Sequence, residues 1–422
     1  MQWLVVLPLE IVAATLTISF WNHGAINNGA WVSIFLLLII SINLFGVKGY
    51  GEAEFIFAII KITAVIGFII LGIIINVGGG PQGSYIGGKF WRDPGAFNNG
   101  LKGLCSTFVN AAFAFSGTEL VGLAAAETAN PRKSLPTAVK QVFWRITLFY
   151  IVSLVLVGLL VPYNDPNLLN GKNSVDIVAS PFVIAIKNAG IEVLPSVFNA
   201  VIMIAVLSVG NSSVYGSSRT LAALAEQNQA PKILAYIDRK GRPLVAIAIA
   251  SLIGLLAFLA CTEKQEDAFT WMLALSGLSA IFTWASICLA HIRFRKGWKL
   301  QGHSLDELAF TSQPGVIGSW IGFLFNILVL IAQFWVAFAP IGYKEKTTRE
   351  LVSGFFSVYL ALPVTLMFYI PYKIYHRTPF IRSYNMDLHT GIRELNIQEL
   401  IDEERAERRK WPRWKKVYKF FC

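Results

Sequence analysis

Long apolar segments recur along almost the whole chain, and they constrain its fold more than any other feature. A helix rises about 1.5 Å per residue, so about 20 apolar residues are needed to cross the roughly 30 Å hydrocarbon core of a bilayer. The sequence therefore predicts an all-α integral membrane protein with about ten transmembrane helices in residues 1–372, followed by a tail over residues 373–422. The predicted spans are 3–20, 31–47, 55–77, 104–126, 142–161, 193–215, 244–261, 269–290, 316–339 and 352–372.

The charge pattern fits a membrane protein and gives its orientation. Charged residues make up 14% of the chain, against about 25% in soluble proteins. The net charge is +11. Most of the basic residues lie in the tail and in the short loops on the same face, which is typical of cytosolic loops. We therefore expect a multi-pass protein with a cytosolic C-terminus, and no nucleic-acid partner.

Several chemical classes are disfavoured by motifs that the sequence lacks. There is no GxxxxGK[ST] phosphate-binding loop, no HExxH and no GxSxG, so neither an ATP-driven pump nor an enzyme is indicated. The four cysteines show no metal-binding spacing. We expect no catalytic residues, no metal and no cofactor. The first residues lack a charged n-region, so we also expect no cleavable signal peptide.

One apolar segment, residues 111–126, has small polar residues and a charge at its centre. It reads AAFAFSGTELVGLAAA, with Ser116, Gly117, Thr118 and Glu119 in the middle. Helix-weakening residues beside a charge at bilayer depth indicate a broken helix that faces a cavity. Such a break is typical of the binding site of a transporter. The alternative is close helix packing through small residues.

Several blocks of the sequence resemble fungal amino-acid permeases of the amino acid–polyamine–organocation superfamily, and general amino-acid permeases in particular. They include FSGTELVGLAAAETANPRKSLPTAVKQVFWRITLFYIVSL, LPSVFNAVIMIAVLSVGNSSVYGSSRTLAALAEQ, YIDRKGRPLV and HIRFRK. The resemblance covers essentially the whole chain. It implies an inverted-repeat amino-acid transporter fold of twelve helices, in which the first segment here resembles the third helix. We therefore expect the first two helices to be missing from this sequence.

The resemblance implies a function as well as a fold. It implies uptake of amino acids, of broad or neutral type, by symport with protons across the plasma membrane. The partners would then be amino acids, protons and the lipid bilayer, together with ubiquitin-dependent trafficking machinery. Because the first two helices have no counterpart, the alternative is a non-transporting truncated form, or a membrane amino-acid sensor or regulatory subunit.

The substrate site is expected first at the break in residues 111–126. A broken helix exposes C=O groups on one side of the break and N–H groups on the other, which suit the ammonium and the carboxylate of an amino acid. By resemblance, backbone carbonyls near Phe113 and Ser116 would face the ammonium, and Phe115 would join Phe113 in an aromatic wall. Gly117 and Thr118 complete this part of the site.

Further substrate contacts are expected on two other spans. By resemblance, the pocket for the substrate side chain would be lined by Ser208, Val209, Gly210 and Asn211 on one span and by Ser276 and Gly277 on another. The alternative is that these residues allow close helix packing, which is common in membranes.

Three ionisable residues inside predicted spans are candidates for proton coupling or gating. Glu119 and Glu10 would each cost a few kcal/mol if charged and unpaired at the bilayer centre, which makes them candidate proton carriers. The alternative is a hydrogen-bonded carboxyl that holds helices together. By resemblance, Lys61 would occupy the place of sodium in sodium-coupled relatives. The alternative for Lys61 is a side chain that snorkels to the interface.

The last residue, Cys422, is a lipidation candidate. It follows two aromatic residues and a basic stretch, a setting in which S-palmitoylation occurs. The alternative is an unmodified terminal thiol.

Overall fold

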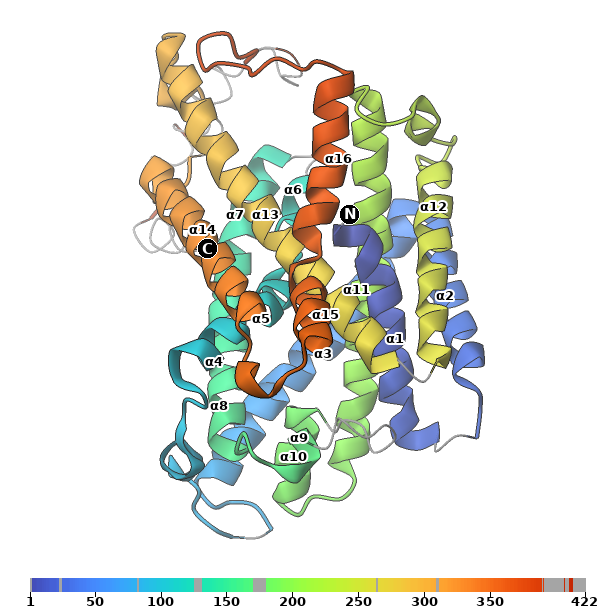
Figure 1. The fold of residues 1–422 in the computed structure, drawn as a ribbon, viewed down its shortest axis with the longest axis vertical. Coiled ribbons are helices and arrows are strands. Elements are labelled where there is room, and N and C mark those ends of the chain that lie inside the picture. The colour runs from blue at the N-terminus through green and yellow to red at the C-terminus, as the bar shows by residue number, and fades with distance from the viewer. Residues whose placement is uncertain are drawn as a thin grey trace. The chain divides into compact units, whose positions relative to one another are not determined.

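The computed structural model describes residues 2–22, 25–81, 83–124, 131–169, 180–262, 265–308, 311–388, 390, 406 and 410–412, and in these ranges the regular structure is entirely helical (Figure 1). The α-helices are α1 Gln2–Asn22, α2 Asn28–Leu44, α3 Gly46–Asn76, α4 Gly100–Ser106, α5 Phe108–Phe115, α6 Leu120–Ala124, α7 Pro131–Arg145, α8 Val152–Leu160, α9 Pro166–Leu169, α10 Pro181–Asn188, α11 Leu194–Glu226, α12 Leu244–Gly254, α13 Gln265–Leu300, α14 Gly315–Phe338, α15 Thr348–Tyr359 and α16 Ala361–Tyr375.

The predicted all-α, multi-span architecture is confirmed, but the count of about ten spans is not. Among the described residues, eight helices are long and apolar enough to cross a membrane. The pair α15 and α16 is bent by 60° and makes a ninth if it is one span. The remaining predicted segment, 31–47, corresponds to α2, which has only 17 residues. Apolar composition therefore located the helices but did not reveal their lengths or bends.

The chain divides into two compact units that interleave along the sequence. Unit 1 consists of Met1–Leu104 and Arg145–Ser276, and unit 2 consists of Cys105–Trp144 and Gly277–Cys422. The predicted boundary at residue 372 stays a prediction, because the tail is described only over residues 373–388, 390, 406 and 410–412.

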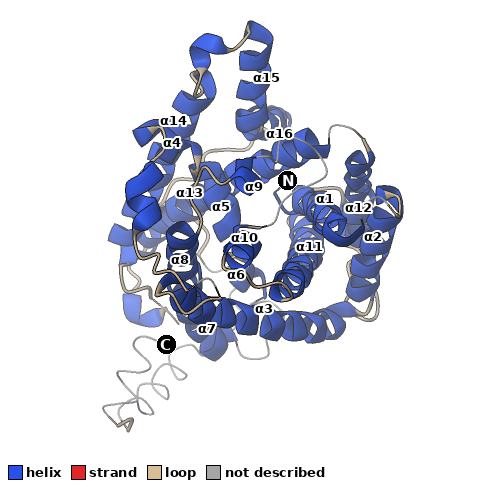
Figure 2. Cartoon of the chain, turned by 90° about the horizontal axis from the view of Figure 1, so that it is seen from below, coloured by secondary structure: helices blue, strands red, loops and turns tan. Residues whose placement is uncertain are grey.

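Unit 1 is built around α1, which packs against α2, α11 and α12 (Figure 2). Small residues on the partner helices allow this close approach. A Cβ atom added to Gly254 of α12 would lie 2.8 Å from Leu7 Cδ2 of α1. Hydroxyl groups within α1 bond to the preceding helical turn, as when Thr15 Oγ1 donates to the carbonyl of Ile11 at 2.8 Å. These features suit a membrane, where contact between helices depends on packing and polar groups need internal partners.

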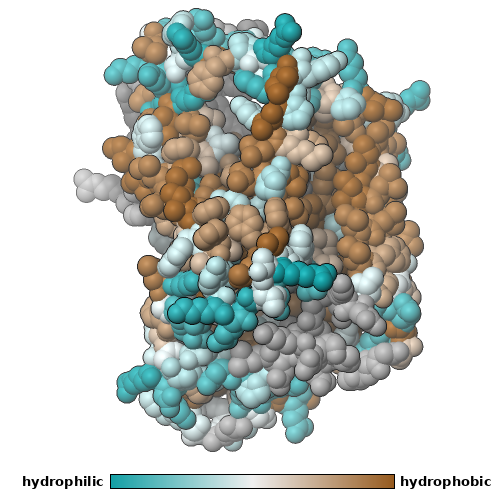
Figure 3. Space-filling view, in the orientation of Figure 1, coloured by the Kyte–Doolittle hydropathy of each residue, from teal (hydrophilic) through white to brown (hydrophobic). Residues whose placement is uncertain are grey.

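The outer flank of unit 1 is apolar. Leu37 of α2 and Leu252 of α12 are each 64% exposed. In Figure 3 the surface over α2 and α12 is almost continuously hydrophobic. An exposed apolar flank of this kind is what contact with lipid tails requires.

The loop before α12 is tied to the end of α2 by one arginine. Arg242 Nη1 donates to the carbonyl of Leu44, and Arg242 Nη2 lies 2.5 Å from Asp238 Oδ2. Asp238 also accepts from the backbone N–H of Arg242 at 2.7 Å and of Lys240 at 2.9 Å. The hydrogen bond from the Arg242 side chain, together with these backbone donors, holds the pKa of Asp238 below its usual value. An ionised Asp238 thus orients the arginine that caps α2.

Unit 2 is held by polar and close-packed contacts between distant segments. Gln333 of α14 is buried and donates from Nε2 to the carbonyl of Cys105 at 2.6 Å. Phe334 packs edge-on against Tyr359 of α15, with ring centres 5.7 Å apart. Gly277 of α13 lies directly against Val109 of α5. These contacts position α5, which leads into the candidate site.

Candidate functional site

The helix within residues 111–126 is broken where the sequence predicts. α5 ends at Phe115 and α6 begins at Leu120. Ser116 is extended, with φ −63° and ψ 154°. Gly117 has a φ of +98°, a conformation that residues with a side chain rarely adopt. The intervening residues, 116–119, therefore leave the helical hydrogen-bond pattern.

The backbone groups at the break bond to nearby side chains. The carbonyl of Phe113 accepts from Ser116 N at 3.0 Å and from Ser116 Oγ at 2.8 Å. The N–H of Gly117 donates to Glu119 Oε2 at 3.2 Å. Trp284 Nε1 of α13 donates to the same oxygen at 3.3 Å. Glu119 is therefore a hydrogen-bonded carboxylate that covers the Gly117 N–H, as in the alternative interpretation of this residue, and its role in coupling stays a prediction.

In unit 1, Lys61 and Ser208 lie in direct contact. Lys61 Nζ donates to Ser208 Oγ at 2.7 Å, and Ser208 Oγ donates to Glu54 Oε2 at 2.6 Å. Lys61 Nζ and Glu54 Oε2 are 3.9 Å apart, so the hydroxyl bridges the ion pair. The Lys61 side chain is 31% exposed, and its amino group points at α11. It does not snorkel away from the other helices to the interface.

Two asparagines extend this cluster. Asn211 Nδ2 donates to Glu54 Oε1 at 2.8 Å, and Asn43 Nδ2 donates to Asn211 Oδ1 at 2.8 Å. Both oxygens of Glu54 therefore accept hydrogen bonds. Sequence reasoning missed Glu54 and Asn43 as members of a site, whereas Asn211 was expected only as part of the substrate pocket. A signal existed for one of them, because Glu54 and Lys61 are seven residues apart and share a face of α3.

The other predicted residues of unit 1 differ in their surroundings. Glu10 of α1 is 5% exposed and makes no ion pair among the described residues. A Cβ atom added to Gly210 of α11 would lie 3.4 Å from the Cβ of Glu10, so Glu10 packs on α11 next to Asn211. Val209 is 39% exposed. The Ser276 hydroxyl is buried and has no hydrogen-bond partner within the described part of the chain.

The remaining predicted residues fall elsewhere. Phe113, Phe115, Ser116, Gly117 and Thr118 are partly buried and belong to unit 2. Cys422 lies outside the described residues.

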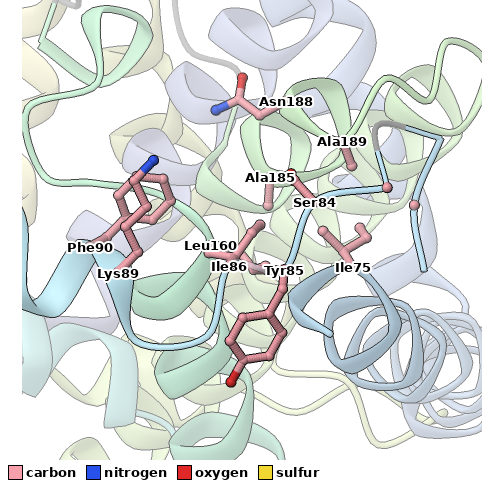
Figure 4. Close-up of a pocket in the computed structure, with 12 residues that line it drawn as sticks. Ile75, Ser84, Tyr85, Ile86, Lys89, Phe90, Leu160, Ala185, Asn188 and Ala189 are labelled. Atoms are coloured by element: carbon pink, nitrogen blue, oxygen red, sulfur yellow. The ribbon is translucent and has the colours of Figure 1, made fainter. Parts of the chain in front are cut away.

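A cavity of about 260 Å³ in unit 1 does not coincide with these residues. It lies between the loop that follows α3 and the helices α8 and α10 (Figure 4). Lys89, Phe90 and Asn188 supply much of its polar and aromatic lining, and Lys89 Nζ lies 5.8 Å from the centre of the Phe90 ring. No predicted site residue is among the residues that line it.

Many membrane-spanning helices, a helix broken beside a carboxylate and a polar cluster within the helices together define a membrane transporter. Residues 1–383 match the family model described as "Amino acid permease". This protein therefore belongs to the amino acid permease family and is a transporter of amino acids, not an enzyme.

The curated relatives that the chain matches agree with this assignment. The general amino-acid permease GAP1 of Saccharomyces cerevisiae is 56% identical over 432 residues, a match that covers 100% of this chain and 71% of the relative. The general amino-acid permease GAP2 of Candida albicans is 58% identical, in a match that covers 100% of this chain and 72% of the relative. A histidine permease of Saccharomyces cerevisiae is 50% identical, in a match that covers 96% of this chain and 68% of the relative.

Proposed function

We propose that this protein takes up amino acids of broad, including neutral, type across the plasma membrane, together with protons. The observation that carries the proposal is the helix break between α5 and α6 in a member of the amino acid permease family. Two relatives that match the whole chain bear the name general amino-acid permease, which supports a broad set of substrates.

The contacts at the break suggest how an amino acid binds. The substrate ammonium would donate to the carbonyl of Phe113 in place of the Ser116 hydroxyl. The substrate carboxylate would accept from the Gly117 N–H in place of the Glu119 carboxylate. Each substrate group thus replaces a protein group of the same hydrogen-bonding type, so no backbone group loses its partner at bilayer depth. Phe113 and Phe115 would flank the bound substrate.

The same exchange supplies a link to protons. A Glu119 carboxylate displaced from Gly117 would lose one of its donors, and an ionised carboxylate with fewer hydrogen-bond partners inside a membrane is costly. Taking up a proton removes that cost. Further candidates for proton binding are Glu10 and Lys61, which is in contact with Ser208. Separately, the buried Ser276 hydroxyl is proposed to contact a polar group of the substrate.

We further propose that the tail beyond residue 372 lies in the cytosol. About a third of the 36 Lys and Arg residues lie in this tail, and basic residues are concentrated on the cytosolic side of membrane proteins. A protease that cleaves a C-terminal tag in intact cells would contradict this orientation. Contacts with ubiquitin-dependent machinery and acylation of Cys422 would then take place on the cytosolic side of the membrane.

Labelled amino-acid uptake in a transport-deficient yeast tests the proposal. The chain as given should accumulate a labelled neutral amino acid. Gly117→Val should abolish uptake, because valine does not tolerate a φ of +98° and the break would be lost. Gly122→Ala is the matched control, since a Cβ there meets nothing within 4 Å. Uptake by Gly117→Val at the wild-type rate, or no uptake by the unmodified chain, would contradict the proposal.

A further inference from the structure

A single hydroxyl group, that of Ser208, bridges the carboxylate of Glu54 on α3 and the ammonium of Lys61. The direct distance from Lys61 Nζ to Glu54 Oε2 is 3.9 Å, which is too long for a hydrogen bond. The two steps through Ser208 Oγ are 2.7 Å and 2.6 Å, both within hydrogen-bond range. The three groups therefore form a continuous hydrogen-bonded chain from ammonium to carboxylate.

We propose that Glu54 is a proton-coupling residue that works with Lys61 through the Ser208 hydroxyl. This inference rests on the proposed proton-coupled transport and assigns a role to a residue outside the break. Ser208 belongs to α11, whereas Glu54 and Lys61 belong to α3. The hydroxyl thus ties the protonation state of the pair to α11, the helix that also carries Val209.

The proton step balances without any other reactant. The Lys61 ammonium gives a proton to Ser208 Oγ while the Ser208 hydroxyl gives its own proton to Glu54 Oε2. The products are a neutral amine, a restored hydroxyl and a neutral carboxylic acid, and the net charge of the pair stays zero. The Glu54 side chain is 20% exposed, so its acid form can release the proton to water. The pair then carries one negative charge until a proton returns.

The asparagines orient Glu54 for this step. Asn211 holds Oε1 of Glu54, which leaves Oε2 for Ser208. Asn43 donates to the Asn211 carbonyl oxygen and so fixes the orientation of that amide. Without this support, the carboxylate could rotate away from the hydroxyl. Asn43 and Asn211 are positioning residues.

Other ionisable groups on the surrounding helices are few and accounted for. The helices α2 and α8, which pack on α3, contain no ionisable side chain. α3 itself also carries Tyr50 and the exposed pair Lys48 and Glu52. α11 carries Tyr215, with Arg219 over its ring, and Glu226 as its last residue. α1, which packs on α11, carries Glu10. The bridged contact of Glu54 with Lys61 distinguishes it from the rest.

The test separates proton-driven transport from amino-acid exchange in liposomes that contain the full chain. Exchange of labelled for unlabelled amino acid at equal pH on both sides needs no net proton movement. Glu54→Gln keeps the size of the side chain but cannot carry the proton. We expect its proton-gradient-driven accumulation to fall about tenfold or more, while its exchange rate stays within about twofold of wild type.

Two further variants make the result specific. Glu52→Gln is the matched control, because Glu52 lies two residues earlier on α3 with its side chain 69% exposed, and both activities should stay at wild-type level. Glu54→Asp keeps a carboxylate and should recover part of the accumulation. Full accumulation by Glu54→Gln, or an equal loss of exchange and accumulation in both Glu54 variants, would overturn the inference. Absence of exchange by the unmodified chain would instead contradict the proposed function itself.

Discussion

Replacing Gly277 with alanine tests how closely α13 packs on α5. A Cβ at this position would lie 2.5 Å from the carbonyl oxygen of Val109 and 2.9 Å from Val109 Cγ1. The obstacle is backbone, which cannot rotate aside as a side chain can, so the two helices must separate by roughly 0.5–1 Å to restore ordinary contact. Forcing an extra methyl group into a packed interior costs about 1–3 kcal/mol, and we expect the upper part of that range.

Gly254 provides the matched control for this substitution. A Cβ there would lie 2.8 Å from Leu7 Cδ2 and 2.9 Å from Leu36 Cδ1, which are the far ends of flexible side chains. These methyl groups can move by a rotamer adjustment, so Gly254→Ala should cost about 1 kcal/mol or less. The two variants therefore make the same chemical change against neighbours that differ in whether they can yield.

The assay is the melting temperature of the detergent-purified protein, followed by the loss of its monodisperse size-exclusion peak after heating. Gly277→Ala should lower it by about 3–8 °C, and Gly254→Ala by no more than about 3 °C. A melting temperature of Gly277→Ala equal to that of the wild type would refute the packing argument. A lower melting temperature for Gly254→Ala than for Gly277→Ala would also refute it. Either result would reopen a role for Gly277 beyond close helix contact.

Three other substitutions have defined outcomes. Glu119→Gln should impair concentrative uptake at all external pH values between acidic and neutral, because the amide oxygen can still accept from Gly117 and Trp284 but the side chain cannot carry a proton. Normal concentrative uptake over this pH range would contradict the prediction. Ser208→Trp should abolish uptake, because Ser208 is 1% exposed and an indole has no room there; unchanged uptake of large amino acids would remove Ser208 from the site. The lowered pKa of Asp238 means that its contribution to stability is complete above about 3.9, the unfolded value, and is lost as the pH falls through the folded value. Asp238→Asn should therefore flatten the acid limb of the melting temperature plotted against pH, and an unchanged slope would count against this.

Helix positions could be predicted from the sequence because span length is a simple consequence of bilayer thickness. The break beside Gly117 could also be predicted, because small residues and a charge weaken a helix locally. The bend between α15 and α16 was missed, although the sequence carries a signal for it. Residues 352–372 are mostly apolar and predict one span, but Pro363 lies three residues after the 60° change of direction at Leu360. A proline has no backbone N–H to donate to the preceding turn, so it favours a break there.

The partners within each site were beyond the reach of sequence reasoning for a different reason. Trp284 bonds to Glu119 across 165 residues of sequence, and Asn211 bonds to Glu54 across 157. Such pairs depend on how helices pack, which periodicity within one segment does not encode. Ser208 illustrates the consequence: the sequence predicts a pocket residue, whereas the structure has its hydroxyl between Lys61 and Glu54.

The proposed function requires that amino acids and protons cross the membrane together through this chain. The most direct measurement records the internal pH of liposomes that contain the purified protein, with a trapped pH indicator, while labelled amino-acid influx is followed in the same sample. Adding a neutral amino acid outside should acidify the interior, and protein-free liposomes should show no such response. Amino-acid influx without internal acidification would contradict proton coupling.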